Sequence, residues 1–349
     1  MAVSDQTIAD NYALYCGDCC EVLPSIPAES VHLSLYSPPF CGLFNYSSHD
    51  QDMSNNRTYD GFLEHYAFLI GEIARVTKPG RMTAVHCMDI PNPGQRTGYY
   101  DFPGKVIALH ERAGFHFYGR AFIWKEPLKV AIRTRLRHLT HKQLVKDSTA
   151  STVAAGDQFL FFKRHGENAE PVSHETGFDR YAGAREVPAE LWQYRGERDQ
   201  QKNRLSHWIW RQYASCFWDD IRIERVLPYK AAKDPDDEKH VHPLQLDAIE
   251  RVVALWSNPG DVVLSPFMGV GSEIFGALIN DRRGIGVELK PSYYRQAIRN
   301  VAAAALPGAV EGENLIQLAA GEAVEDDHEI EAGLAADGAY VPNDEEEAA

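Results

Sequence analysis

Four consecutive residues, Ser37-Pro38-Pro39-Phe40, are of types that could carry out chemistry. They follow an apolar, β-prone run, 31–36, and two prolines cannot continue a strand, so the chain is expected to turn into a loop. A planar amine could donate one hydrogen to the Pro38 carbonyl and one to the Ser37 side chain, with its ring stacked on Phe40. Such contacts would make the amine nitrogen a better nucleophile without a strong base. The same four residues could also simply close a strand.

A second candidate site lies far downstream. A strand over 262–264 is followed by a Gly-x-Gly loop at Gly269 and Gly271, a helix, a second strand and then Glu288. Glycines let the backbone approach a ligand closely, and an acid after the second strand can hold ribose hydroxyls. Glu288 lies 17 residues after Gly271, near the usual spacing of about 20. The third glycine of a dinucleotide motif is not in register, so the pattern favours an adenosine-type cofactor other than NAD or FAD.

The two motifs together resemble a known family. Ser-Pro-Pro-Phe at 37–40, Ser-Pro-Phe-Met-Gly-Val-Gly-Ser at 265–272 and Gly-Val-Glu at 286–288 look like the motifs of a DNA amino-methyltransferase of the β order. In that circularly permuted family the catalytic loop precedes the S-adenosylmethionine loop, and the target-recognition region lies between them. The resemblance covers roughly residues 12–303, and it is greatest to the orphan methylases of phages and prophages, relatives of restriction-modification enzymes.

The resemblance implies roles for individual residues. Glu288 would hold the ribose, and Asp18, in a Gly-Asp-Cys motif, would meet the adenine amino group. A segment that resembles Lys-x-x-His-Pro-x-Gln would border the methionine end. Ser265 stands where the family usually has Asp, and Leu246 and Asp247 stand where Lys and Pro are common. The implied catalytic residues are Ser37, Pro38, Pro39 and Phe40, and the implied cofactor-binding residues are Asp18, Lys239, His242, Pro243, Ser265, Phe267, Gly269, Gly271, Ser272 and Glu288.

The implied reaction is direct transfer of a methyl group from the sulfonium of S-adenosylmethionine to the exocyclic amine of a base flipped out of double-stranded DNA. It needs no metal, no covalent intermediate and no cysteine nucleophile. Ser-Pro-Pro-Phe is common among cytosine-N4 enzymes, whereas the resemblance over the stretches 35–46 and 240–287 is to orphan methylases of which several look like adenine enzymes. We expect adenine N6, with cytosine N4 as the alternative.

The charge is segregated along the chain. The net charge is −15, but residues 301–349 contain 13 acids and no Lys or Arg, so the other 300 residues carry only −2. The stretch 129–146 contains six basic residues and no acid, and the stretch 194–218 interleaves arginines with tryptophans and tyrosines. Basic side chains neutralise phosphates and aromatic ones stack on bases. The candidate DNA-binding residues are Lys129, Arg133, Arg135, Arg137, Lys142, Arg195, Arg204 and Arg211, although a solvated basic helix would give a similar pattern.

Strands and helices alternate in both halves, which predicts an α/β, Rossmann-like fold with a largely parallel sheet. We expect a catalytic half over 1–124, an inserted recognition region over 125–238, a cofactor-binding half over 239–305 and a disordered acidic tail over 306–349. Expected helices are 60–77, ended by Pro79-Gly80, 102–113, 246–256, 272–280 and 291–304. Expected strands include 82–87, 115–124 and 159–162, and the polar stretch 41–59 is expected to be a loop over the site.

The chain shows no signal-peptide pattern and no apolar run of about 18 residues, so we expect a cytoplasmic protein without a membrane segment. Six cysteines are too few and irregular for a disulfide framework, and Cys16-x-x-Cys19 has no second pair at a zinc-like distance. The pairs His138 and His141, and His240 and His242, also lack partner ligands, so no metal is expected. The relatives suggest a possible homodimer.

Three other functions compete with this one. Methyltransferases of protein glutamine or RNA use a similar Pro-Pro loop, but they usually have Asn in place of Ser37, the unpermuted order and no basic insertion. A binding module with an inactive catalytic site is supported only by Ser265 in place of Asp. A nicotinamide oxidoreductase would leave the Pro-Pro loop unexplained.

Overall fold

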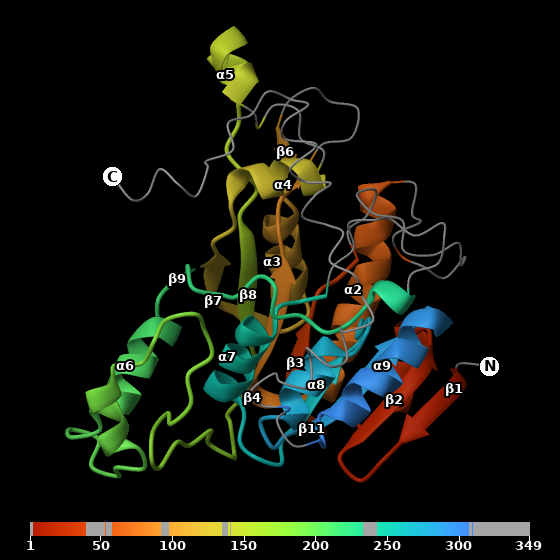
Figure 1. Ribbon diagram of the computed structural model, residues 1–349. Helices are drawn as coiled ribbons and strands as arrows, with labels where there is room; N and C mark the ends of the chain where they lie inside the picture. Colours follow the sequence, from red (N-terminus) through yellow and green to blue (C-terminus); the bar gives the residue numbers. More distant parts are fainter. Residues whose placement is uncertain are drawn as a thin grey trace.

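A computed structural model of the protein describes residues 3–39, 53, 58–91, 98–134, 139, 141–232, 243–306 and 309, with only the backbone of 132–134. Its centre is a nine-stranded sheet, and a two-stranded ribbon pairs β5 (Ile90–Pro91) with β6 (Tyr99–Tyr100) (Figure 1). The order across the large sheet is β1 (Val3–Ile8), β2 (Tyr12–Gly17), β11 (Arg283–Glu288), β10 (Val262–Ser265), β3 (Val31–Tyr36), β4 (Thr77–Cys87), β8 (Asp157–Arg164), β7 (Phe115–Ile123) and β9 (Phe217–Trp218).

The five strands from β2 to β4 are mutually parallel, while β8 runs antiparallel between β4 and β7. The described helices are α1 (Cys19–Val22), α2 (Tyr59–Val76), α3 (Phe102–Arg112), α4 (Pro127–Thr134), α5 (His141–Lys146), α6 (Arg204–Tyr213), α7 (Leu246–Trp256), α8 (Ser272–Leu278) and α9 (Pro291–Ala303). Four 3₁₀ turns are also described: η1 (Leu23–Ser25), η3 (Ser148–Ala150), η4 (Ala189–Tyr194) and η5 (Lys230–Ala232).

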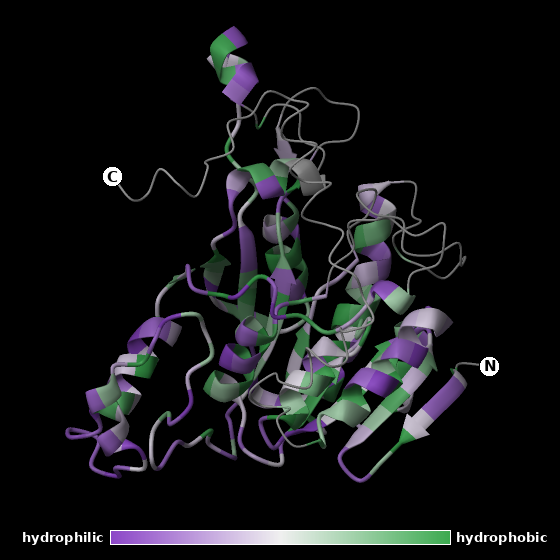
Figure 2. Ribbon diagram, in the orientation of Figure 1, coloured by the Kyte–Doolittle hydropathy of each residue, from purple (hydrophilic) through white to green (hydrophobic). Residues whose placement is uncertain are grey.

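Helices cover both faces of the sheet (Figure 1). On one face, α2 and α3 bury Phe62, Tyr66 and Val106 against strand residues such as Phe162. On the other, α7 packs against β3 and β4, α8 packs against β10 and β11, and α9 packs against β2. The strands between the two helix layers are accordingly hydrophobic, whereas α6 is mostly hydrophilic (Figure 2). This arrangement confirms the predicted Rossmann-like α/β class.

Most predicted elements are present, but the bounds of one strand differ and several elements were not predicted. The helix over 60–77 ends at Val76 as α2, but Pro79-Gly80 lies within β4, which begins five residues before the expected strand. Gly80 has φ +70°, and the pairing register with β3 shifts there, so the strand accommodates the Pro-Gly pair as an irregularity rather than beginning after it. The edge strand β1 was not predicted, because its residues are mostly polar and exposed.

The stretch 125–238, predicted as an insertion, contributes to the main sheet. Its strand β8 lies between β4 and β7, and its short strand β9 extends the sheet beyond β7. The predicted boundary at 124 therefore falls between strands of one sheet, and it stays a prediction as a domain division. The predicted acidic tail over 306–349 and the loop over 41–59 lie almost wholly outside the described residues.

A buried polar network supports the end of β3. The Tyr36 hydroxyl lies 3.1 Å from the Tyr66 hydroxyl and 3.3 Å from Nε2 of His110, whose Nδ1 donates to the Val106 carbonyl at 2.8 Å. The imidazole stacks on Phe162 with ring centroids 4.0 Å apart. Burial lowers the pKa of His110 to about 4, which the bond to the Val106 carbonyl only partly offsets. The ring is therefore neutral in the folded protein, with Nε2 free to accept from Tyr36.

We expect this histidine to limit stability in acid. A lowered folded-state pKa means that the unfolded chain takes up a proton first, so stability is present above pH 6.5 and is lost as the pH falls toward 4. His110→Gln removes this titration. Between pH 7.5 and pH 5 the free energy of unfolding of the wild type should fall by about 2 kcal/mol more than that of the variant, as measured by urea unfolding at both pH values. Equal losses would contradict the assignment.

Candidate active site

The two sequence motifs meet at one edge of the sheet. β3 and β10 are parallel neighbours, with Leu264 opposite Ser34, and both run into loops at the same edge. From β3 the chain continues through α2 to β4 on one side, and from β10 through α8 to β11 on the other side. Such a switch point opens a crevice beyond the strand ends, where open α/β sheets bind ligands. The rings of Tyr36, beside Ser37, and Phe267 lie 6.0 Å apart between centroids.

The glycine loop is shaped by its backbone angles. Gly269 and Gly271 have φ +54° and +93°, in the region that favours glycine. A Cβ on Gly271 would lie 2.9 Å from Cγ2 of Val301, so α9 packs directly against the loop. A Cβ on Gly269 would meet no atom within 4 Å, so the chain leaves room for a ligand there. Ser272 follows as the first residue of α8.

Glu288 and Asp18 lie at neighbouring strand ends. Both Glu288 oxygens accept backbone N–H groups: Oε2 from Gly269 at 2.9 Å and Oε1 from Lys290 at 2.8 Å. This carboxylate therefore fixes the glycine loop. β2 pairs with β11 up to Cys16 and Glu288, and Asp18 caps α1 just beyond, its Oδ1 accepting from the Cys20 N–H at 2.9 Å. The two acids predicted for ribose and adenine thus lie along one side of the crevice.

Two buried hydroxyl groups, without hydrogen-bond partners in the described part of the chain, flank the glycine loop. Ser265 is fully buried and Ser272 is 3% exposed, and neither Oγ has a hydrogen-bond partner among the described residues. Unsatisfied buried hydroxyls are costly in a native core, and a bound polar ligand removes that cost. Together with the open space at Gly269, they fit the polar methionine and ribose groups of S-adenosylmethionine.

Glu273 was not predicted as a site residue. It follows Ser272 in the first turn of α8 and is only 4% exposed. Burial, together with the nearby Glu288 charge, raises its pKa to about 8. The signal in the sequence was an acid two residues after Gly271, where the dinucleotide motif had already been found out of register.

Ser37 is held by residues that the sequence motifs did not reveal. Its Oγ lies 2.8 Å from Nδ1 of His86, near the end of β4, and Nε2 of the same ring lies 2.6 Å from Oδ1 of Asp157, the first residue of β8. The other oxygen of Asp157 pairs with Nζ of Lys125. Burial would raise the pKa of Asp157, but His86 and Lys125 outweigh it and hold the pKa well below its usual range.

The remaining predicted residues are distributed as follows. Pro38 is buried and Pro39 half-buried beside Ser37, and Pro243 is half-buried just before α7. Phe40, Lys239 and His242 lie outside the described residues. Asp247, where the family commonly has Pro, is fully buried and accepts three hydrogen bonds from Arg222 and one from Arg225. It therefore fastens the chain around 222–225 to α7 instead of contacting a ligand.

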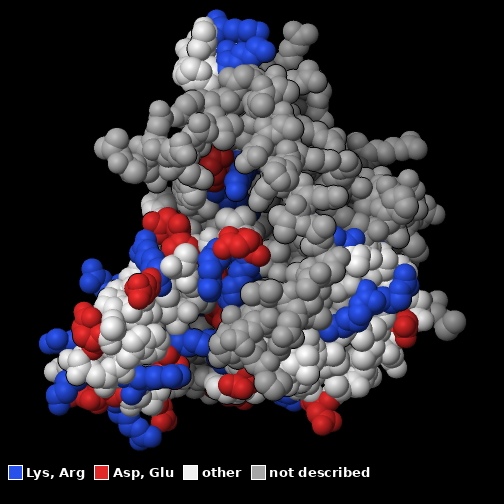
Figure 3. Space-filling view, in the orientation of Figure 1, with Lys and Arg blue, Asp and Glu red and all other residues white. Residues whose placement is uncertain are grey.

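The predicted DNA-binding side chains fall into two separate groups. Lys129 on α4 and Lys142 on α5 are exposed, and Figure 3 shows Lys and Arg side chains gathered at the tip formed by α5. Only the backbone of Arg133 is described, and Arg135 and Arg137 lie outside the described residues. The second group, Arg195, Arg204 and Arg211, surrounds α6, where acidic side chains are interspersed (Figure 3).

Side chains of the second group contact their own chain. Arg195 pairs with Asp179 at 3.8 Å, and the Arg204 guanidinium lies 5.6 Å from the centre of the Tyr194 ring. α6 packs through Leu205, Ile209 and Tyr213 beside Ala254 and Leu255, near the end of α7. The loop after α7 leads to the start of β10, so α6 lies toward the edge of the sheet opposite Ser37.

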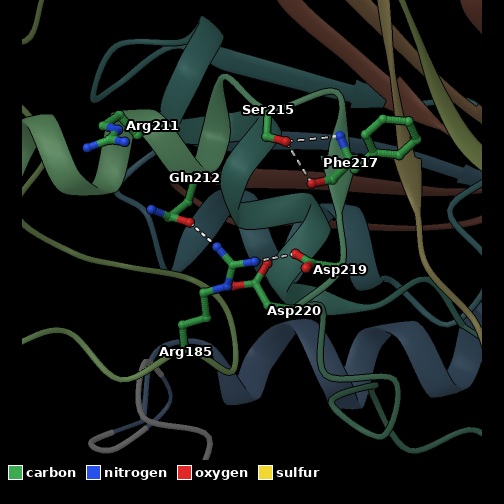
Figure 4. A pocket seen from close by; sticks show the side chains of 7 residues that line it. All are labelled: Arg185, Arg211, Gln212, Ser215, Phe217, Asp219 and Asp220. Carbon is green, nitrogen blue, oxygen red and sulfur yellow. Dashed lines mark hydrogen bonds and ion pairs between the residues drawn. The ribbon is translucent and has the colours of Figure 1, made fainter.

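A polar hollow of about 380 Å³ lies between the end of α6 and β9 (Figure 4). Arg185 crosses it, donating to Gln212 and pairing with Asp219 at 2.6 Å. Its lining residues are Arg185, Arg211, Gln212, Ser215, Phe217, Asp219 and Asp220. It contains none of the predicted catalytic or cofactor-binding residues and lies apart from Ser37.

Among the described residues, one group of side chains of metal-binding types lies close together: the ligand atoms of Asp18, Cys19 and Cys20 are within 4.8 Å of one another. Cys16, predicted not to form a zinc pair with Cys19, is not in this group. The five described cysteines form no disulfide. None of the described helices is long and apolar enough to cross a membrane.

The sequence and the fold match a known family. The family model described as DNA methylase, for N6 and N4 methyltransferases, matches residues 31–299, and the chain belongs to this family. It is therefore a DNA methyltransferase of the adenine-N6 or cytosine-N4 type, with S-adenosylmethionine as methyl donor.

Individual relatives are distant but cover most of the chain. The type II methyltransferase M.BglI of Bacillus subtilis is 24% identical over 320 residues, covering 82% of this chain and 84% of its own. The DNA adenine methyltransferase YhdJ of Escherichia coli K12 is 23% identical over 291 residues, covering 82% and 81%.

Solved structures share the fold. The Thermus thermophilus protein TTHA0409, in complex with S-adenosyl-L-methionine, has a TM-score of 0.56 at 22% identity, covering 85% of this chain and 97% of its own. The cytosine-N4-specific PvuII DNA methyltransferase has a TM-score of 0.57 at 17% identity, covering 90% and 94%.

We expect Glu273 to destabilise the protein as the pH rises. Its folded-state pKa lies above the unfolded value of 4.5, so the proton retained on folding stabilises the protein in acid, and this contribution is lost between pH 4.5 and about 8. Relative to Glu273→Gln, the wild type should lose about 3 kcal/mol between pH 5 and pH 7.5. The free energy of unfolding is measured by urea unfolding of both proteins at both pH values. An equal change for the two proteins would refute a buried, protonated Glu273.

Proposed function

We propose that this chain methylates the N6 amine of adenine in double-stranded DNA, on a base flipped out of the duplex and into the crevice beside Ser37. The observation that carries the proposal is the meeting of two loops at one switch point: Ser37 follows β3, and the glycine loop follows the adjacent strand β10. A base beside Ser37 would therefore lie next to the methyl donor.

The chain contributes alignment and hydrogen-bond acceptors to the reaction. When bound, S-adenosylmethionine supplies an electrophilic methyl group on a sulfonium. Ser37 and the Pro38 carbonyl accept the two amine hydrogens, which directs the nitrogen lone pair toward the crevice and stabilises the positive charge that grows on the nitrogen. Glu288 and Asp18 orient the adenosine end, and the buried Ser265 and Ser272 hydroxyls meet the polar methionine end.

Adenine is favoured by the DNA adenine methyltransferase YhdJ, which this chain matches over most of both sequences. Cytosine N4 is the second candidate, supported by Ser37 in place of Asp and by the likeness to the cytosine-N4-specific PvuII structure. Both amines are planar and offer two hydrogens, so Ser37 and Pro38 alone do not distinguish them.

Product analysis tests the proposal. The purified chain is incubated with labelled S-adenosylmethionine and mixed genomic DNA, which is then hydrolysed to nucleosides for mass spectrometry. We expect label in 6-methyladenine, and at least a roughly 100-fold lower rate for Ser37→Ala, because the amine loses an acceptor. Label in 4-methylcytosine would transfer the assignment to the second candidate. No label in DNA while the cofactor still binds would contradict a DNA substrate.

The segment that includes α4 and α5 is our candidate for the DNA-contacting arm. It leaves the sheet after Ile123, the end of β7, and returns at Asp157, the start of β8. Lys125 and Asp157, at its two ends, pair with each other beside His86 and Ser37. The exposed lysines of α4 and α5 therefore project from the same edge of the sheet that carries the proposed base pocket. α6 lies toward the opposite edge.

A salt titration separates the two basic groups. Each phosphate contact contributes about 0.9 to the slope of log affinity against log salt concentration. We expect the double variant Lys142→Gln with Lys146→Gln to weaken DNA binding and reduce this slope by nearly two. Arg204→Gln on α6 is the matched control and should leave the slope unchanged, as measured by fluorescence anisotropy with a labelled duplex. The reverse pattern would assign the DNA contacts to α6.

A further inference from the structure

We infer that His86 and Asp157 are positioning residues, which fix the Ser37 hydroxyl as a hydrogen-bond acceptor for the target amine and then take up the proton that the amine releases. This inference rests on the proposed function and deepens it. It begins from a chain of contacts: Ser37 Oγ to His86 Nδ1 at 2.8 Å, His86 Nε2 to Asp157 Oδ1 at 2.6 Å, and Asp157 to Lys125.

A serine at this position has an ambiguity that a carboxylate lacks. A hydroxyl carries one donor hydrogen and two acceptor lone pairs, and the hydrogen rotates to suit its surroundings. If the O–H of Ser37 pointed toward the target amine, it would face the amine hydrogens and repel them. For Ser37 to act as an acceptor, another group must bind its hydrogen.

The imidazole of His86 is that group, because the charge of Asp157 determines which ring nitrogen carries the proton. Asp157 is ionised and accepts only, so the His86 nitrogen that faces it, Nε2, carries the ring proton. In the neutral ring Nδ1 is then an acceptor, and it takes the hydrogen of the Ser37 hydroxyl. Both lone pairs of the serine oxygen are left for the crevice.

Lys125 completes the arrangement by balancing the buried charge. The side chains of Lys125, His86 and Asp157 are 15%, 12% and 6% exposed. The ammonium pairs with the carboxylate oxygen that does not face His86, so the buried ion pair is neutral overall. It also fixes which Asp157 oxygen is presented to the imidazole.

Stability alone does not account for these residues. Removing two charges and an imidazole from water is expensive, and apolar side chains of similar volume often stabilise a core as well or better. A buried apolar side chain lies beside the imidazole: the His86 ring lies 5.2 Å from the Phe159 ring, and Phe159 is fully buried. A polar chain in such a place that ends on the catalytic serine points to a role in the reaction.

The same chain of contacts provides a path for the proton. As the new N–C bond forms, the S–C bond breaks with its electron pair remaining on sulfur, and the amine nitrogen becomes cationic. One N–H proton passes to Ser37 Oγ while the hydroxyl proton passes to His86 Nδ1, which leaves a neutral methylamine, an intact serine and an imidazolium beside Asp157. Release of that proton to water restores the neutral ring.

Asp157→Asn gives the sharpest test because Lys125 can only donate. It would hold the Asn carbonyl and turn the amide NH₂ toward His86, which places the ring proton on Nδ1, the wrong tautomer. The serine hydrogen would then point at the amine. We expect the turnover rate to fall about 100-fold, while the dissociation constants for cofactor and DNA change less than about threefold. The turnover rate of His86→Phe should fall at least as far, because phenylalanine can neither accept a hydrogen bond nor take up a proton.

A double-mutant cycle separates positioning from a general structural effect. If His86 and Asp157 act only through Ser37, then Asp157→Asn should reduce the already low rate of Ser37→Ala by less than about twofold. The matched control is Asp261→Asn. Asp261 is also buried, pairs with Arg81 and lies 3.5 Å from His32, but at the start of β10, at the opposite edge of the sheet. The Asp261→Asn substitution should lower the melting temperature without lowering the turnover rate of the folded protein.

Wild-type turnover in Asp157→Asn, an equal loss in the Asp261→Asn control, or independent losses from Ser37→Ala and Asp157→Asn would each overturn the inference. A failure of the proposed function is distinguishable, because the wild type itself would then leave DNA unlabelled. Circular dichroism and melting curves for each variant confine the comparison to folded protein. If His86→Phe does not fold, Asp157→Asn, which replaces one oxygen by an NH₂ group, still decides the question.

Discussion

The parallel pairing of β3 with β10 is the constraint on which the remaining structure depends. These two strands carry the residues before Ser37 and before the glycine loop, and their register places Leu264 opposite Ser34, so both loops leave the sheet together. Because the following helices lead to opposite sides of the pair, the two strand ends form a switch point of the kind at which open α/β sheets bind ligands. A one-residue slip between these strands would turn every side chain to the other face. The two helix layers, each burying a different set of strand residues, resist such a slip.

Polar groups buried around this crevice have two different functions. His110, Tyr36 and Tyr66 satisfy one another behind β3, and their hydrogen bonds maintain the shape of the strand end. Ser265 and Ser272, in contrast, have no partners among the described residues, which suits a surface that a polar ligand completes. Networks of the first kind rigidify a site, and groups of the second kind give a ligand something to bind. Under the proposed function, the protein therefore combines a stabilised strand end at Ser37 with a glycine loop whose buried hydroxyls a bound cofactor would satisfy.

The sequence predicted what is encoded locally. Gly269, Gly271 and Glu288 could be recognised because backbone angles above zero and a strand-terminal acid leave a pattern within a short stretch. β8 was visible as four consecutive apolar residues, 159–162, but nothing local showed that it inserts between β4 and β7. His86 and Asp157 could not be found, because 49 and 120 residues separate them from Ser37. The parallel pairing of β4 with β3 brings His86 to Ser37, and the antiparallel pairing of β8 with β4 brings Asp157 to His86. The predicted homodimer, the metal-free reaction, the cytoplasmic location and the phage or prophage origin stay predictions.

The most direct test is a crystal structure of the full chain with S-adenosylhomocysteine, the demethylated cofactor, and an unmethylated duplex that contains the sequence the enzyme methylates. The account predicts a flipped base whose exocyclic nitrogen lies about 3 Å from Ser37 Oγ. It also predicts the cofactor sulfur on the side of the glycine loop and the His86 ring still in contact with both Ser37 and Asp157. A target base held away from Ser37, or a cofactor bound outside the crevice between β3 and β10, would contradict it.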